Sequence, residues 1–260
     1  TLHMTLAAYA ATGFAVAGIH AWGLLRDPGS AFHRHALRFA LWLGVPAALA
    51  LPISGDYSAR VVARHQPAKL AAMEALFRTQ RGAPLVIGGW PDEARGEVRF
   101  AIEIPKALSW LAFRDPDAEV LGLDAVPEDE RPPVAIVHLA FQIMVAFGTA
   151  MAAVGAWVVW RAVRRRDVLG HRPLLRALVA TGPLGLLAIE AGWTVTEVGR
   201  QPWIVYGVLR TADAVTPMPG LVVPLVLVTL LYLVLGAVVA LLLSREVATS
   251  VRGLRAPEAA

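Results

Sequence analysis

The sequence predicts an all-α integral membrane protein with five transmembrane helices and one large outer-side loop between the second and third spans. Its 260 residues are 57% hydrophobic and 17% charged, whereas a soluble domain is about 45–50% apolar and about 25% charged. The apolar residues are gathered in long runs, which is typical of a chain that has a bilayer as solvent. The chain has no cysteine, so thiolate metal sites are excluded and a metal centre must use His, Met or carboxylates.

Each of the five apolar runs is long enough to cross a hydrocarbon core, which takes about 20 residues of helix. The first and third runs contain no Asp, Glu, Lys or Arg, while the fourth contains Glu190 deep inside it. All five are too long to be strands. The predicted spans are Leu2 to Leu25, Ala36 to Ile53, Val134 to Trp160, Pro173 to Glu197 and Gly220 to Leu243.

The long segment between the second and third spans is predicted to lie outside the membrane and to begin with polar, turn-rich sequence. Pro67 to Phe77 is predicted to be a short helix, because Pro stands in its first turn and good helix formers follow. Val98 to Ile104 alternates like a short strand, and the rest is predicted to be irregular. The expected division is residues 1–54 with spans one and two, the loop 55–133, and residues 134–260 with spans three to five and a tail.

The placement of Arg and Lys predicts which loops face the cytoplasm, because short basic loops stay on that side. The loops after the first and third spans and the C-terminal tail together carry a net charge of +8, the opposite side carries −3, and Glu190 supplies −1. We therefore expect the first residue and residues 55–133 outside and the tail in the cytoplasm. The basic charge balance then reflects membrane topology, and no nucleic acid partner is predicted.

Two residues in the predicted spans have side chains that suit haem ligation. His3 stands at the outer end of the first span, and Met144 lies about two to three turns into the third span, which starts from the same face. Such a His and Met pair can ligate one haem iron. From the residues alone, the alternative is that Met144 fills the core and His3 faces headgroups. His20 and His138 are interpreted as interfacial or as bonded to a neighbouring carbonyl.

Glu190, Trp193, Glu197 and Arg200 are spaced three, four and three apart, which places them on one stripe of a helix. Two carboxylates and an arginine on a membrane helix are disfavoured unless protein, cofactor or water covers them. For Glu197 and Arg200, an ion pair at the membrane edge is the alternative interpretation. Glu190 lies two turns deeper, where an exposed carboxylate is harder to accommodate.

Lys69 and Glu74 lie five residues apart on the predicted loop helix. A carboxylate that takes a hydroxyl proton and a cation that donates to a carbonyl oxygen would suit a quinol. A solvated charged helix is the commoner explanation for such residues, so both interpretations stay open at this point.

Three stretches form motifs that occur in order along the chain. The first is Gly55-Asp56 with Gln66 to Glu74, and the second is Phe141 to Ala146. The third runs from Glu190 to Thr211 and contains the characteristic sequence Gly-Arg-Gln-Pro-Trp. Together they resemble the quinol-binding loop, the haem-ligating span and the high-spin haem region of subunit I of the cytochrome bd-type quinol oxidases. The short loop resembles the branch that is often cyanide-insensitive.

The resemblance implies roles for individual residues. His3 and Met144 would be the axial ligands of a low-spin haem b, and Lys69 and Glu74 would contact quinol in the outer loop. Glu197 would ligate one of the two high-spin haems, a haem b and a haem d.

Three further roles follow from the same resemblance. Trp193 would lie between haems, Arg200 would offset propionate charge, and Glu190 would belong to the haem environment or to proton handling. The family often has Arg where this chain has Gln142. The loss of a cation beside a haem favours the oxidised state, so we predict a lower low-spin potential.

The resemblance implies a terminal oxidase of the bacterial cytoplasmic membrane that oxidises quinol outside and reduces O2 to water. Its expected partners are membrane lipid, subunit II, a small accessory subunit and the helices of the same subunit that would precede Thr1. The remaining high-spin ligand would lie on those helices, so the 260 residues alone are expected to be inactive. The alternatives are a non-redox transporter that binds a cation at Glu190 and Glu197, a scaffold subunit, or a degenerate half that binds one haem b.

Overall fold

The computed structural model describes residues 1–253, with side chains through Arg245. It contains two compact units, Thr1–Ala214 and Val215–Ala260. Within the described residues, five candidate spans confirm the predicted fold class: Leu2–Arg26, Ala31–His65, Glu128–Val163, Arg172–Val198 and Val222–Arg245. Residues 254–260 of the expected cytoplasmic tail, Arg255 among them, lie outside the described residues, as does the side chain of Arg252.

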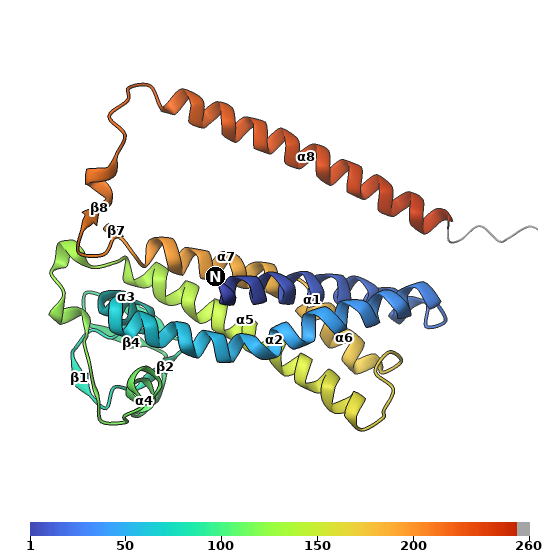
Figure 1. Cartoon of the computed structure of the whole chain (residues 1–260), viewed down its shortest axis with the longest axis horizontal. Coiled ribbons are helices and arrows are strands. Elements are labelled where there is room, and N and C mark those ends of the chain that lie inside the picture. Colours follow the sequence, from blue (N-terminus) through green and yellow to red (C-terminus); the bar gives the residue numbers. More distant parts are fainter. Residues whose placement is uncertain (254–260) are drawn as a thin grey trace, which may run out of the picture. The chain divides into compact units, whose positions relative to one another are not determined.

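The first unit contains five long helices that run side by side (Figure 1). They are α1 (Leu2–Arg26), α2 (Ala31–His65), α5 (Val134–Val163), α6 (Arg172–Thr181) and α7 (Leu184–Val198). The second unit contains α8 (Val222–Gly253). Helices α2 and α7 each pack against both α1 and α5.

Glycines allow α1 and α2 to approach closely. A methyl group added at Gly13 would lie 2.5 Å from the Cα of Gly44, so a side chain at this crossing would push the helices apart. Small residues at the contact let helix backbones pack closely in a membrane, where the lipid gives no hydrophobic driving force for association. The crossing is surrounded by buried apolar side chains, among them Phe14 and Leu37, which are both fully buried.

Two spans differ from the expectation. Helix α2 continues to His65, although turns were expected after Ser54. An ion pair between Asp56 and Arg60, one helical turn apart, stabilises this extension. The fourth span is two helices, because the chain breaks at Gly182-Pro183, where proline removes a backbone donor.

The loop between α2 and α5 is more ordered than the sequence suggested. The predicted helix is α3 (Pro67–Glu74), and it ends at Ala75, whose φ of 49° is left-handed. The part expected to be irregular contains further short elements. They are β1 (Gln80–Arg81), β2 (Leu85–Ile87), β3 (Trp90–Asp92), β4 (Glu97–Arg99), β5 (Ile102–Ile104), α4 (Ala107–Phe113), β6 (Glu119–Val120), η1 (Leu123–Ala125) and η2 (Glu128–Glu130).

The predicted strand is two strands within one antiparallel hairpin, residues 85–104, which we call the bent hairpin. Strand β2 pairs with β5, with Ile87 opposite Ile102, and β3 pairs with β4, with Trp90 opposite Arg99. The bend falls at Gly88 and Gly89, whose φ angles of 68° and 90° favour glycine. Strands β1 and β6 form a second antiparallel pair.

After α7, the chain forms β7 (Trp203–Val205), β8 (Leu209–Arg210) and η3 (Thr211–Ala214), with β7 and β8 antiparallel. Figure 1 shows α3, α4 and the loop strands gathered at one end of the α1, α2, α5 and α7 helices. Side chains from that loop therefore meet those at the ends of the membrane helices.

Candidate functional site

The Glu74 side chain is buried at the end of α3, with 3% of its surface exposed. One carboxyl oxygen has no hydrogen-bond partner, and the backbone N–H of Val86 donates to the carboxyl. Burial raises the pKa of Glu74 to about 8, although the Val86 hydrogen bond acts in the opposite direction. Burial therefore favours the protonated form of Glu74.

Helix α5 holds the backbone that covers Glu74. Gln142 Nε2 donates to the carbonyl of Val86 at 2.9 Å, and the N–H of Gly88 donates to Gln142 Oε1 at 3.0 Å. One turn away, the ring nitrogens of the fully buried His138 face the carbonyls of Met73, at 2.9 Å, and of Gly88, at 3.1 Å. We call His138 and Gln142 the α5 clamp.

The sequence predicted only part of this arrangement. His138 is bonded to carbonyls, as expected, while His20 contacts His33, with 2.9 Å between their Nδ1 atoms. The role of Gln142 in binding loop backbone was missed. Its only sequence signal is a polar amide in an apolar run, which gives no information about its partner.

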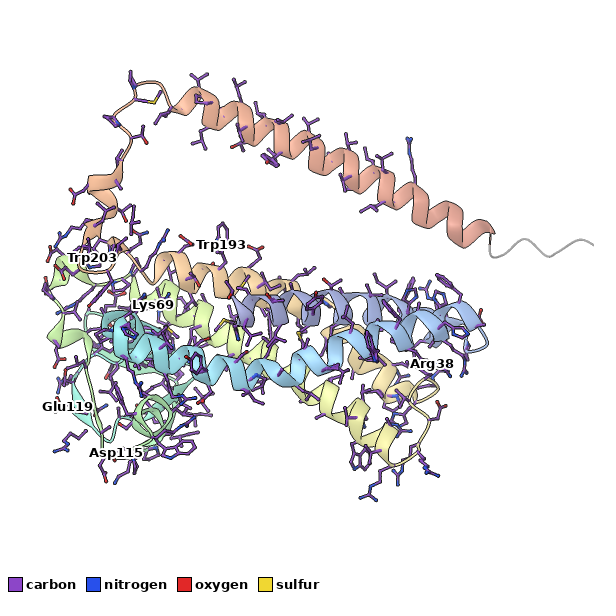
Figure 2. All side chains as sticks on the ribbon, in the orientation of Figure 1. Arg38, Lys69, Asp115, Glu119, Trp193 and Trp203 are labelled. Atoms are coloured by element: carbon purple, nitrogen blue, oxygen red, sulfur yellow. The ribbon has the colours of Figure 1, made fainter. Side chains whose placement is uncertain are left out.

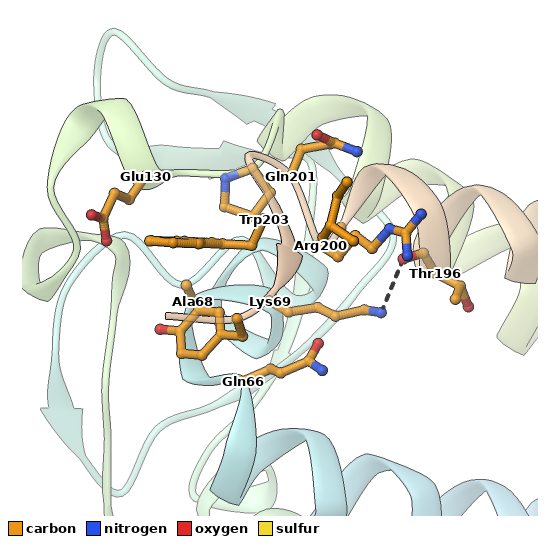
Figure 3. A pocket seen from close by; sticks show the side chains of 12 residues that line it. Gln66, Ala68, Lys69, Glu130, Thr196, Arg200, Gln201 and Trp203 are labelled. Carbon is orange, nitrogen blue, oxygen red and sulfur yellow. Dashed lines mark hydrogen bonds between the residues drawn. The ribbon is translucent and has the colours of Figure 1, made fainter. Parts of the chain in front are cut away.

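Lys69 lies on another side of α3 from Glu74 and lines a cavity of about 220 Å³ (Figure 3). Its Nζ donates to the carbonyl of Thr196 in α7 at 3.4 Å. Burial lowers the pKa of Lys69; the Glu197 carboxylate raises it, and the Arg200 cation lowers it further. Glu74 is not among the residues that line this cavity, so the structure does not bring the predicted quinol pair into one cavity.

The same cavity contains hydrogen-bond donors that have no acceptor. The Nε of Arg200 and the Nε1 of Trp203 are buried and unpaired, while another guanidinium nitrogen of Arg200 donates to Glu197. Buried polar groups are nearly always paired in native proteins. Together with Lys69, these donors make the cavity wall suitable for an anionic or carbonyl oxygen.

His3 and Met144 are the two candidate axial ligands. His3 Nδ1 lies 2.8 Å from Ser54 Oγ, which leaves Nε2 as the ring nitrogen available to a metal. Gly55 lies beside the His3 ring, and a methyl group at Gly192 would lie 2.9 Å from the Met144 sulfur. An imidazole and a thioether are side chains of the kinds that would hold a b-type haem, and each lies next to a glycine.

Glu190, Trp193 and Glu197 of the predicted stripe lie on α7, whereas Arg200 lies in the turn that follows its last residue, Val198. Glu190 and Trp193 are exposed on the first unit, with Trp193 at 61% (Figure 2), whereas Gly192 on another side of the helix faces Met144 of α5. Glu197 is partly exposed and pairs with Arg200. The structure therefore brings Lys69 and Arg200 together at one cavity, with Glu197 paired to Arg200 but outside the cavity lining. It leaves Glu190 and Trp193 facing away from the packed helices.

Comparison with known proteins identifies the relatives of this chain. Residues 1–251 match the family model described as cytochrome bd terminal oxidase subunit I. A Bacillus subtilis (strain 168) protein provisionally named cytochrome bd menaquinol oxidase subunit I is 40% identical over 244 residues, covering 91% of this chain and 54% of the relative. The cytochrome bd ubiquinol oxidase subunit 1 of the same organism is 30% identical over 259 residues, covering 94% and 55%.

The fold is also similar to that of a solved structure. The bd oxidase from Geobacillus thermodenitrificans is 40% identical, with a TM-score of 0.82, and the match covers 95% of this chain and 57% of that chain. The chain thus spans about half the length of the curated relatives that it matches.

Proposed function

Because the chain belongs to the cytochrome bd terminal oxidase subunit I family, we propose that it supplies the quinol-oxidising loop and haem ligands of a terminal quinol oxidase. The observation that carries this proposal is the buried carboxyl of Glu74, which has an unpaired oxygen. The backbone over it is bonded to α5, the helix that also carries Met144. A proton acceptor and a candidate haem ligand are therefore linked through one helix.

The proposed chemistry on the loop is proton transfer. Oxidation of a quinol to a quinone releases two electrons and two protons, and Glu74 accepts a proton from a quinol hydroxyl. Lys69 donates a hydrogen bond to a quinol oxygen, and its lowered pKa makes the ammonium a stronger acid. Both residues are on α3, but they face different surroundings, so the contact of each with quinol is proposed separately.

The membrane helices hold the cofactors in this proposal. Haem, when bound, supplies the one-electron transfer and oxygen reduction for which amino-acid side chains are unsuited. His3 Nε2 and Met144 Sδ would hold the low-spin haem b, and Glu197 would hold a high-spin haem b or haem d. Arg200, whose Nε is unpaired and buried, offsets propionate charge.

The exposed stripe of α7 belongs to the same site. Glu190 would handle protons or complete the haem environment, and Trp193 would lie between haems. Both side chains are exposed on a membrane helix, where an uncovered carboxylate is disfavoured. Contact with haem, subunit II or other helices of the subunit would shield Glu190 from lipid and so remove this unfavourable exposure.

The charge distribution supports an orientation for the reaction. Basic residues gather in the loops after the first and third spans, which favours the cytoplasmic side for those loops. In this orientation, the loop with Lys69 and Glu74 faces outward, in a bacterial cytoplasmic membrane, and quinol protons leave on that side. A small accessory subunit is a further proposed partner.

Replacing Glu74 tests the proposal in the full-length subunit within its assembled oxidase. Glu74→Gln should slow haem reduction by quinol at least about 100-fold, because general base catalysis contributes roughly 10²–10⁴-fold. Reduction by dithionite should stay unchanged, since that reagent needs no quinol site. Stopped-flow absorbance measures both rates.

Glu103→Gln is the matched control, because Glu103 is an exposed carboxylate on β5 of the same loop. It should leave both rates unchanged. Rapid quinol reduction in Glu74→Gln would contradict the assignment of the base, and a purified protein without haem bands would support a transporter or scaffold instead.

A further inference from the structure

The bent hairpin has an uncovered apolar face in the described part of the chain. Ile87 and Ile102 pair across the strands and are 46% and 67% exposed, and Ile104 is 43% exposed. At the bend, Phe100 is 95% exposed. We call Ile87, Phe100, Ile102 and Ile104 the hairpin face.

The opposite side of β2 is already used. Val86 is buried and bonded to Glu74 and Gln142, so the alternation along the strand points Ile87 away from the protein. In a loop surrounded by water, one side of such a hairpin would carry polar residues. Three isoleucines and a phenylalanine together indicate a contact surface.

The exposed Phe100 also has a strained backbone conformation. Its φ is +59°, a conformation that is uncommon for a residue with a bulky side chain. A strained backbone conformation persists only where the surrounding structure holds the residue in it, and such residues are concentrated at functional sites. At this position, the hairpin holds an aromatic ring away from the rest of the chain.

The α5 clamp fixes the depth of the hairpin relative to the membrane. The uncharged run of α5 extends from Val134 to Trp160. A hydrocarbon core of about 30 Å spans about 20 helical residues, so the edge of the core on the loop side falls between Val134 and about Gln142. Gly88, at the bend, is bonded to Gln142 and His138, so the bend lies at the boundary between hydrocarbon and headgroups.

Most charges on the hairpin lie beyond the bend, around β3 and β4, while Glu103 alternates with Ile102 and Ile104 on β5 and pairs with Val86 on the other side of the strands. Asp92, Arg95, Glu97 and Arg99 form ion pairs with one another around β3 and β4. Trp90, 58% exposed, lies between these charges and the bend. Tryptophan is enriched at membrane interfaces, where an apolar ring meets polar surroundings.

We propose that the hairpin face inserts into the boundary between headgroups and acyl chains of the leaflet on the loop side, and so anchors this loop to lipid. Lipid is the expected contact, because the bend is bonded to a membrane-spanning helix at the level of the bilayer edge. A short hairpin with few apolar side chains suits shallow insertion, as in interfacial segments that lie in the plane of the membrane.

Spin labels measure the depth directly. Phe100→Cys and Ile102→Cys are made in the full-length subunit of the assembled complex in lipid nanodiscs, with cysteines elsewhere in the complex replaced; residues 1–260 contain none. A nitroxide at either position should collide more often with O2, which concentrates in lipid, than with a water-soluble nickel chelate. Glu119→Cys, an exposed strand residue in the same loop (Figure 2), should show the reverse.

Either of two results would overturn the proposal. Greater access for the nickel chelate at positions 100 and 102 would place the face in water, and protection from both reagents would show that protein covers it. Unmodified complex provides a second measurement, because a photoreactive lipid should label residues 100–104 more strongly than 115–119. Neither experiment depends on quinol or electron transfer, so the outcome is separate from that of the proposed oxidase function.

Discussion

Glu74 and Glu197 are both carboxyls at the loop end of the membrane helices, yet their surroundings differ. Glu74 is enclosed by α3, the bent hairpin and α5, and its carboxyl has no ionic partner. Glu197 is on a partly exposed side of α7 and pairs with Arg200, while Glu190 on the same stripe is exposed.

The difference shows which part of the site this chain builds for itself. Around Glu74, the chain supplies the burial, the backbone donor and the α5 clamp that holds that donor in place. On α7, it leaves Glu190 exposed and Glu197 partly exposed. Substitutions near Glu74 should therefore alter both the stability of the loop and the rate of quinol oxidation. Substitutions of the proposed haem ligands should remove haem and leave the helices packed.

Removing a haem ligand should give the largest effect. His3→Ala and Met144→Ala should each abolish the low-spin haem b band in reduced-minus-oxidised spectra of the full-length protein, because the iron would lose one of its two axial ligands. His20→Ala is the control and should preserve the band, since His20 pairs with His33. A band that survives in either ligand variant would refute the assigned pair.

Glu74 should make the stability of the loop depend on pH by several kcal/mol, since one pKa unit corresponds to about 1.4 kcal/mol. The folded pKa of about 8 lies above the ordinary value of 4.5, so the fold favours the protonated form. This stabilisation is fully present below pH 4.5 and is lost as the pH rises through about 8. Hydrogen exchange at Val86 should report it, and Glu74→Gln should remove the dependence.

Breaking the α5 clamp should have a smaller effect on stability. Gln142→Leu leaves the carbonyl of Val86 and the N–H of Gly88 without partners, and each lost partner costs about 1–3 kcal/mol. Faster proteolysis within residues 85–104 measures the loosened hairpin. Gln80→Leu, at an exposed position on β1, should leave proteolysis unchanged, and equal cleavage in both variants would contradict the role of the clamp.

Gln142→Arg separates charge from hydrogen bonding. If a missing cation lowers the low-spin potential, the arginine should raise it in a redox titration. Arginine has no acceptor atom, so the bond from Gly88 is lost in this variant as well. An unchanged low-spin haem potential in Gln142→Arg would contradict the electrostatic prediction. Proteolysis of the same variant would still test the α5 clamp.

Removing an exposed ion pair should have the smallest effect on the stability of the loop. Lys106 and Asp117 pair on the loop surface, and the nearby ammonium lowers the pKa of Asp117. Such pairs contribute about 0–1 kcal/mol, so Lys106→Ala should barely change thermal unfolding in moderate salt. A loss as large as that in Gln142→Leu would show that surface charge, rather than the clamp, stabilises the loop.

Much of the helical frame was predictable from the sequence. The bounds of α1 and α5 match the predicted runs within a few residues, because apolar length is a local property that the bilayer requires directly. The α7 stripe was also predictable, since helical spacing alone puts Glu190 and Glu197 on one side. The extension of α2 was not predicted, because the polar residues after Ser54 are equally compatible with a helix and with turns.

Composition and the length of the apolar runs therefore predicted that this chain spans a membrane and which helices carry the candidate ligands, and the resemblance of three motifs indicated the family. Only tertiary structure decided that Lys69 and Glu74 face different surroundings and that Gln142 binds Val86 and Gly88. Those contacts join residues more than 50 positions apart. They depend on how hydrogen-bonding groups meet when helices and loop pack, and neither hydropathy nor helical period contains that information.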